Sequence, residues 1–259
     1  MPKLAANLST MFKEHPFLAR FGAAARAGFR AVEYQYPYEH SAEEVAKAAR
    51  DAKLPVVLHN MPRGDIDKSE HGTACLPGRE AGFRDDLELA ITYARAAGCK
   101  SLHVMAGVPR YDADLPECHR VYVANLKHAA ARLKREGMRL LIEPLSEKTV
   151  AGCFLKSSAQ AIRVLDEVGA DNAFLQYDFF HMQLMEGNLS ATVERLLARI
   201  GHVQLADAPD RHEPGTGEIN YAFLLAKLDE LGYAGWVGCE YTPKGETVEG
   251  LKWATRYLS

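Results

Sequence analysis

Four apolar runs in the second half of the chain each end in a side chain that can bind a hard divalent cation. The four side chains are Glu143, Asp178, Gln204 and Glu240. Three carboxylates and one amide oxygen suit Mg²⁺ or Mn²⁺ better than they suit zinc in a closed structural site. The runs lie roughly 25 to 35 residues apart, which is the spacing of a repeated strand, loop and helix. One acidic residue after a strand is typical of a surface loop, but four in consecutive units predict one metal site.

The sequence around two of these residues refines the prediction. Pro144 follows Glu143. Because proline pushes the preceding residue towards an extended conformation and cannot extend a ladder, Glu143 should end its strand. His181 lies three residues after Asp178, which places it at the mouth of the site rather than in the wall. A lone histidine would more often be structural, but here it could bind a substrate oxygen or support a metal ligand from behind.

Three further polar residues follow other predicted strands. Arg211 lies in the loop after the strand that carries Gln204, and its guanidinium could hold an anionic group or form a salt bridge within the loop. His59 and His103 come at the ends of two earlier strands and could line the opposite side of the mouth as substrate-binding residues. For each of these histidines, a satisfied core or rim position is an equal alternative.

Strand-like and helical runs alternate along the chain. The predicted strands are residues 4–7, 31–34, 56–59, 101–105, 139–143, 173–178, 202–205 and 236–240. The predicted helices are residues 17–27, 41–53, 79–97, 116–136, 157–168, 189–200 and 221–231, and residues 247–257 close the chain. Ser41 followed by Glu44 forms a capping-box pattern at the start of the second helix. Residues 60–78 have no periodicity and predict a long loop, typical of a lid or binding loop.

Eight strand-helix units predict an α/β protein, a single-domain (β/α)₈ TIM barrel over residues 1–259. An open doubly wound sheet could use similar units, but no G-x-G-x-x-G follows the first strand and fewer strands would suffice. No linker rich in proline, glycine and serine marks a domain boundary. Because the active site of such a barrel lies at the C-terminal ends of its strands, the four candidate ligands should converge.

Composition and charge narrow the class of partner. The 259 residues are 47% hydrophobic and 25% charged, which is typical of a folded protein with a large core. A net charge of -3 gives no long-range reason to bind nucleic acid or an acidic membrane, which leaves a small molecule as the expected partner. The sequence has no apolar stretch of ~18 residues and no secretory signal, so we expect a cytoplasmic protein. Its five cysteines contain no C-x-x-C pair and predict reduced thiols.

The most distinctive segments of the chain are residues 5–9, 76–80, 103–107, 209–214, 217–221 and 238–241. With them, nearly the whole chain resembles the hydroxypyruvate isomerase family. This family lies within the xylose isomerase-like barrel superfamily, which also contains sugar epimerases and endonuclease IV-type enzymes. The resemblance implies an aldose-ketose type isomerisation of a small hydroxy-oxo acid. It also implies that Glu143 and Glu240 are both metal ligands and the paired acid and base.

The physical chemistry of that reaction agrees with the predicted residues. Hydroxypyruvate and tartronate semialdehyde (2-hydroxy-3-oxopropanoate) differ by a proton moved between adjacent carbons through an enediolate. A divalent cation stabilises the negative charge that develops, and a carboxylate removes the carbon-bound proton. Arg211 could hold the substrate carboxylate. Very similar family members are 2-oxo-tetronate isomerases, whose substrate is one carbon longer, and a methylene-sized difference is worth only ~1 to 3 kcal/mol.

Three other functions compete with this interpretation. Asp178 with His181, and Asp210-Arg211-His212, also resemble the zinc-binding pattern of endonuclease IV-like nucleases. Gln204, however, stands where those enzymes would have a histidine ligand, and an amide is a poor zinc ligand. A sugar epimerase would keep the metal site and invert one carbon. A binding barrel without chemistry would lack a ligand or an acid/base residue, whereas all four are present here.

The oligomeric state is left open by the sequence. Residues 34–38 contain three tyrosines, and we expect their aromatic side chains to be exposed. Such a segment could serve the interface of a homo-oligomer or the rim of the pocket.

Overall fold

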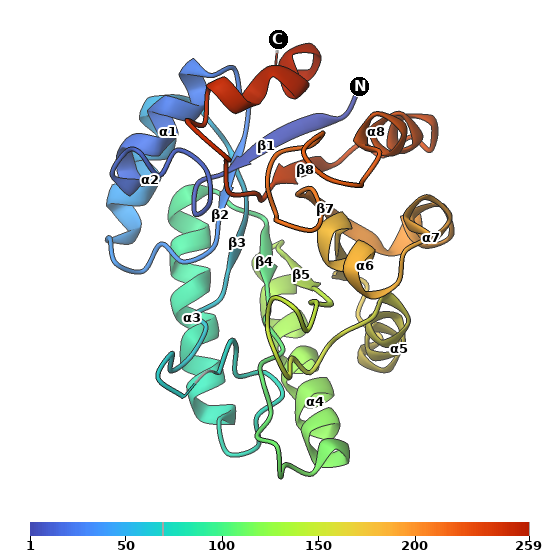
Figure 1. Ribbon diagram of the computed structural model, residues 1–259. Helices are drawn as coiled ribbons and strands as arrows, with labels where there is room; N and C mark the ends of the chain where they lie inside the picture. Colours follow the sequence, from blue (N-terminus) through green and yellow to red (C-terminus); the bar gives the residue numbers. More distant parts are fainter. Residues whose placement is uncertain (69, 259) are drawn as a thin grey trace.

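The strands form a closed parallel barrel in the computed structural model, which describes residues 1–68 and 70–258 (Figure 1). The strands are β1 (Lys3–Asn7), β2 (Val32–Tyr34), β3 (Val56–Asn60), β4 (Ser101–His103), β5 (Arg139–Ile142), β6 (Ala173–Asp178), β7 (Ile200–Leu205) and β8 (Trp236–Cys239). Each strand pairs in parallel with its neighbour in sequence, and β1 closes the ring by pairing with β8. The predicted single-domain TIM barrel is confirmed.

The helices surround the ring of strands, as Figure 1 shows. They are α1 (Phe17–Arg26), α2 (Ala42–Ala52), α3 (Glu80–Ala97), α4 (Leu115–Lys134), α5 (Ser158–Val168), α6 (Phe179–Met185), α7 (Leu189–Leu196) and α8 (Tyr221–Glu230), with 3₁₀ helices η1 (Leu197–Arg199) and η2 (Glu249–Tyr257). The predicted capping box is present, because the Ser41 hydroxyl accepts the N–H of Glu44 and the Glu44 side chain accepts the N–H of Ser41. In the described part of the chain, none of the helices combines the length and apolarity needed to cross a bilayer.

The strands are buried on both faces, which explains their unbroken apolar runs. Leu140, Leu141 and Ile142 of β5 have no exposed surface. In a parallel barrel, one face of each strand packs against the helices while the other fills the interior. Polar residues therefore gather only at the strand ends and in the layer of the interior just below them.

The structure differs from the predicted elements mainly between β6 and β7. Helix α6 begins directly after Asp178, whose carboxylate accepts the N–H of Phe180 at 2.8 Å, and no helix was predicted there. A helix of seven residues is too short to show a clear helical period in the sequence. The helix predicted at 189–200 ends at Leu196, and β7 begins at Ile200, two residues earlier than predicted.

The aromatic segment after β2 is not the exposed patch that the sequence suggested. Tyr34 is buried and packs edge-to-face against Phe17 and Phe21. Tyr38 is partly buried and contacts Tyr93. The prediction was wrong because the first tyrosine lies within β2 and faces helix α1. A homo-oligomer remains a prediction, with no support from this segment.

Candidate metal and active site

The four predicted ligands converge at one end of the barrel. Glu143 follows β5, Asp178 ends β6, Gln204 lies near the end of β7 and Glu240 follows β8. Asp178 pairs directly with Gln204 in the register of β6 and β7. All four residues are at most 7% exposed. The parallel direction of the strands therefore brings residues from four separate units into one buried cluster.

The three carboxylates of the cluster lie in an environment that favours their neutral forms. Burial, with repulsion from Glu240 and Asp178, raises the pKa of Glu143 well above its ordinary value. Burial also raises the pKa of Asp178 to about 6 and the pKa of Glu240 to about 7, although Arg211 lowers both. Carboxylates held together away from water are stabilised either by protons or by a cation between them.

Two carboxylate oxygens of this cluster are suited to a metal ion. Glu143 Oε1 and Asp178 Oδ2 are buried and have no hydrogen-bond partner among the described residues. Potential ligand atoms of Glu143, Asp178 and His181 all lie within 4.8 Å of one another. A buried acceptor without a donor is costly, and a cation would satisfy both oxygens at once. The residues present therefore fit a divalent metal ion.

The position of His181 shows which atom it offers to the cluster. The ring lies on α6 and is buried rather than at an open mouth. Its Nδ1 accepts the backbone N–H of Ser146 at 3.2 Å. Burial, with repulsion from Arg211, holds the pKa of His181 well below its usual range, so the ring is neutral and its proton is on Nε2. Nε2 lies 3.7 Å from Asp178 Oδ2 and 4.0 Å from Glu143 Oε1, which gives the site an N–H donor.

Arg211 contacts the carboxylates of the cluster. Its Nη2 donates to Glu240 Oε1 at 2.9 Å and lies 3.8 Å from Asp178 Oδ2, and its guanidinium lies 5.2 Å from the centre of the Phe180 ring. The loop that carries it is held by the buried carboxylate of Asp207, which accepts backbone N–H groups from residues 215, 217 and 219. Arg211 thus belongs to the site and not to a salt bridge within its own loop.

The two remaining histidines behave differently from one another. His103 Nδ1 lies 3.5 Å from Glu143 Oε2, and burial lowers the pKa of His103 to about 3. His59 instead stacks on Tyr34 at 5.8 Å, and its Nδ1 lies 3.1 Å from the carbonyl oxygen of Asn60. Burial lowers the pKa of His59 to about 4. Within the described residues, no hydrogen bond or ion pair joins His59 to the four predicted ligands, so its environment is that of a core histidine.

Sequence reasoning missed several polar residues that support the cluster. Gln35 donates to Glu240 Oε1 at 2.6 Å. Gln204 donates from Nε2 to Glu240 Oε2 and to Glu33 Oε1, and its Oε1 accepts from Gln176. Glu33 could have been identified because it is a charged residue inside the apolar run of residues 31–34. A charged residue within a buried strand needs polar partners.

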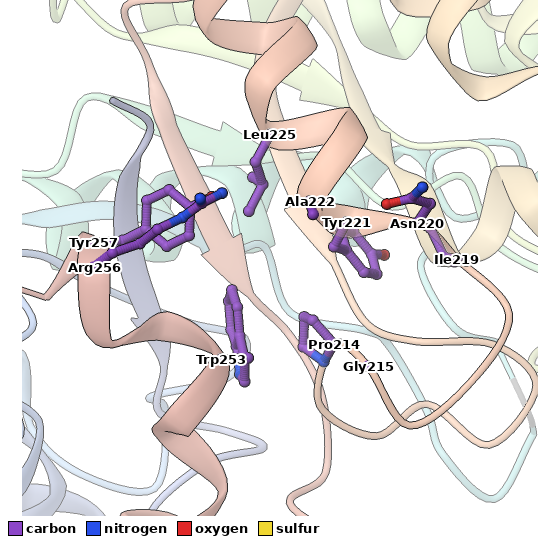
Figure 2. A pocket seen from close by; sticks show the side chains of 10 residues that line it. All are labelled: Pro214, Gly215, Ile219, Asn220, Tyr221, Ala222, Leu225, Trp253, Arg256 and Tyr257. Carbon is purple, nitrogen blue, oxygen red and sulfur yellow. The ribbon is translucent and has the colours of Figure 1, made fainter.

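A separate cavity of about 440 Å³ lies outside the barrel, between α8 and η2. Figure 2 shows Tyr221 and Leu225 of α8 facing Trp253 and Tyr257 of η2 across it. The residues that line it include none of the four predicted ligands and no acidic residue or histidine. Its mostly apolar wall offers no acid/base pair, so the strand ends remain the candidate site.

Comparisons with known proteins agree with this fold. A family model described as "Xylose isomerase-like TIM barrel" matches residues 21–257. The chain is 45% identical to the 2-oxo-tetronate isomerase of Haemophilus influenzae and 45% identical to the hydroxypyruvate isomerase of Escherichia coli. Each alignment covers 99% of this chain and 100% of the relative. A crystal structure of a Brucella melitensis protein named "AP endonuclease, family 2" is similar with a TM-score of 0.97 and 42% identity, over 99% of both chains.

Proposed function

The chain belongs to the xylose isomerase-like TIM barrel family, and on this basis we propose that it is an isomerase of a small hydroxy-oxo acid. The reaction interconverts a 2-oxo acid and its aldehyde or keto isomer, with hydroxypyruvate and tartronate semialdehyde as the first pair. The observation that carries the proposal is the cluster of Glu143, Asp178 and Glu240, whose buried carboxyl groups all have raised pKa values. The names of the full-length relatives support the same reaction class.

We propose that Glu143, Asp178, Gln204 and Glu240 hold one Mg²⁺ or Mn²⁺ ion. Oxygen ligands of this kind suit a hard cation. When bound, the ion polarises the substrate carbonyl and stabilises the negative charge of the enediolate. Gln204 takes part through its amide oxygen, which has to leave Gln176 and turn towards the carboxylates. A positive charge there favours this rotation, because the oxygen is the negative end of the amide.

Glu143 and Glu240 serve as the paired acid and base. One carboxylate removes the proton from the carbon that bears the hydroxyl group, and the pair returns a proton to the former carbonyl carbon. The hydroxyl proton passes to the former carbonyl oxygen in the same conversion, so that the hydrogen count of the substrate is unchanged. Burial raises the pKa of Glu240 to about 7, which suits both directions of transfer near neutral pH, since the best general acids and bases titrate close to the working pH. Each therefore acts as a ligand and as a proton carrier.

Three side chains bind the substrate in this mechanism. His181 donates its Nε2 proton to the substrate oxygen on which charge develops. His103, beside Glu143, orients that carboxylate and lines the pocket. Arg211 moves from Glu240 to the substrate carboxylate, a contact that its planar guanidinium can make with two parallel hydrogen bonds. The role predicted for His59 in substrate binding would require a contact other than those it makes with Tyr34 and Asn60.

The second candidate substrate is a four-carbon 2-oxo-tetronate. The relatives from Haemophilus influenzae and Cupriavidus necator, 45% and 46% identical, carry that name. The metal site and the acid/base pair are the same for both acids. The Brucella protein is instead named as an endonuclease. Gln204 at the end of β7 and the net charge of -3 favour the isomerase, because a zinc cluster prefers histidine and a DNA backbone prefers positive charge.

An NMR assay of hydroxypyruvate and 2-oxo-tetronate tests the proposal. The metal-stripped protein should be inactive, and Mg²⁺ or Mn²⁺ should restore turnover. Glu143→Gln and Glu240→Gln should each lose about 10²- to 10⁴-fold in rate. Glu186→Gln is the control, because this carboxylate accepts hydrogen bonds from Ser158 away from the site. Full turnover in both site variants would refute the mechanism, and cleavage of an abasic-site duplex by the zinc-loaded protein would favour the nuclease.

We further propose that the protein acts in the cytoplasm, as its composition suggests, and independently of nucleic acid and membranes.

A further inference from the structure

Another buried carboxylate, that of Glu33, lies in the interior of the barrel beside Gln204. Glu33 of β2 has no exposed surface, and three side-chain nitrogen atoms converge on its two oxygens. Asn7 Nδ2 and Gln204 Nε2 donate to Oε1 at 2.9 and 2.7 Å, and His202 Nε2 lies 2.6 Å from Oε2. Since β1 and β8 lie between β2 and β7 in the ring, this network joins strands that do not pair with each other.

The backbone of β8 makes room for this carboxylate. A Cβ atom placed on Gly238 would lie 2.2 Å from Glu33 Oε2 and 2.4 Å from Oε1, closer than any side chain could approach. Gly238 also pairs with Gln204 in the register of β7 and β8. Glu33 can therefore occupy its position only because residue 238, beside Gln204, is a glycine.

Glu33 determines which end of the Gln204 amide faces it. Glu33 Oε1 accepts N–H groups from Asn7 and Gln204, so the Gln204 amide turns its nitrogen and not its oxygen towards Glu33. The same nitrogen also donates to Glu240 Oε2. One N–H of Gln204 is therefore held by Glu33 and the other by Glu240, while the amide oxygen accepts from Gln176.

We propose that Glu33 is a positioning residue that anchors the amide of Gln204 by its nitrogen. About this anchor the amide oxygen turns from Gln176 towards a divalent cation beside the Glu240 carboxylate. Asn7 and His202 keep Glu33 in place. This inference rests on the proposed function, because it assigns the support of the same metal site. Groups that hold a metal ligand from behind typically change metal affinity or activity by about 10- to 100-fold when they are replaced.

Glu33→Gln tests the proposal, with Mn²⁺ affinity measured by isothermal titration calorimetry. The variant keeps the shape of the side chain but replaces one carboxylate oxygen by an NH₂ group, which cannot accept the N–H groups of Asn7 and Gln204. We expect the Kd for Mn²⁺ to rise by about 10- to 100-fold. Glu186→Gln, which removes another hydrogen-bonded carboxylate, should keep the affinity of the wild-type protein. Thermal unfolding of each metal-free variant shows whether it is folded.

A second pair of variants tests the anchor if Glu33→Gln does not fold. His202→Gln retains an N–H that can donate to Glu33, whereas His202→Leu leaves Glu33 Oε2 without its donor. We expect His202→Leu to weaken Mn²⁺ binding by about tenfold and His202→Gln to recover most of that loss. A merely structural role would alter unfolding without this difference in metal affinity.

The outcomes separate this inference from the proposed function. A wild-type protein that binds Mn²⁺ but isomerises neither acid would overturn the proposed function, while a weakened Glu33→Gln variant would still support the positioning role. A wild-type protein that binds Mn²⁺ and isomerises hydroxypyruvate, with the same Mn²⁺ affinity in the folded Glu33→Gln and His202→Leu variants, would overturn the positioning role alone. An equal loss of affinity in Glu186→Gln would also overturn it, because the effect would then be one of charge in general.

Discussion

The backbone N–H of Ser146 donates to Nδ1 of His181 at 3.2 Å, and this contact places the imidazole proton on Nε2. Ser146 lies three residues after Glu143, so the segment that carries one predicted ligand also sets the tautomer of the histidine facing it. A protonated Nε2 cannot ligate a metal ion, but it can donate to a substrate oxygen. The geometry therefore distinguishes His181 from the carboxylates with which it clusters.

Replacing His181 should separate metal binding from catalysis. We expect His181→Leu to bind Mn²⁺ as the wild-type protein does and to lose about 10²- to 10³-fold in kcat, the usual cost of removing one donor to a developing oxyanion. Asp178→Asn is the comparison, because it removes a ligand and should weaken Mn²⁺ binding directly. Calorimetry and the NMR assay measure the two effects. Loss of Mn²⁺ binding in His181→Leu as large as in Asp178→Asn would make the histidine a ligand.

Replacing Arg211 by lysine should affect substrate binding more than the chemical step. Lysine keeps the charge but cannot form two parallel hydrogen bonds with a carboxylate. A hydrogen bond to a charged group is worth about 1.5 to 3 kcal/mol, so KM for hydroxypyruvate should rise by about tenfold or more in Arg211→Lys. Initial-rate kinetics at saturating metal measure the change. A fall in kcat at constant KM would instead assign Arg211 to proton transfer.

The metal-free protein should lose stability as pH rises through the titration of its buried carboxylates. Burial raises the pKa of Glu240 from 4.5 to about 7, so the folded state keeps a proton that the unfolded chain releases. The stability from this group is fully present below about pH 4.5 and is lost as pH rises through about 7. Relative to Glu240→Gln, the wild-type protein should therefore become less stable across this range.

Urea unfolding of both proteins at a series of pH values measures that difference. The buried histidines His59 and His103 have lowered pKa values and act in the opposite direction, but they are common to both proteins and cancel in the comparison. Addition of Mg²⁺ should remove the loss at higher pH, because the ion binds the ionised carboxylates of the folded state only. Parallel stability curves for the two metal-free proteins would contradict the prediction.

Substitution of Gly238 by alanine should destabilise the barrel interior. The new methyl group would meet the Glu33 carboxylate at 2.2 Å, and overpacking of this kind costs about 1 to 3 kcal/mol. Gly245→Ala is the control, since a Cβ there meets no described atom within 4 Å. Chemical denaturation of the metal-free proteins gives both free energies of unfolding. Equal stability of the two variants would show that Glu33 can move aside without cost.

The barrel and the four strand ends could be predicted because both depend on local patterns. An apolar run followed by a polar residue marks the end of a buried strand, and the repeat of such runs gives the ring. The contact of Glu33 with Gln204 could not be predicted in this way, because it joins two strands that do not pair with each other and leaves no spacing to recognise. The sequence contained one sign of this contact, namely that Glu33 is a charged residue within a buried strand and so requires a polar partner.

The two strand-end histidines show why similar sequence positions can differ in role. His103 pairs with Asn60 in the register of β3 and β4, while His59 pairs with Leu102. Since side chains alternate across a strand, His59 and His103 face opposite sides of the sheet. His103 therefore meets Glu143 inside the barrel, and His59 meets Tyr34 on the helical side. The register between neighbouring strands decides this, and it cannot be read from either strand alone.

The pairing of β1 with β8 has a consequence for folding during translation. Lys3 pairs with Trp236, and Glu240 follows one residue after β8. A chain that emerges from the ribosome N-terminus first therefore acquires the second proposed acid/base group only after β8 is made. Contacts between the two ends of a chain also form slowly, because a long loop must close first. Nascent chains should thus remain catalytically silent until β8 and Glu240 have been synthesised.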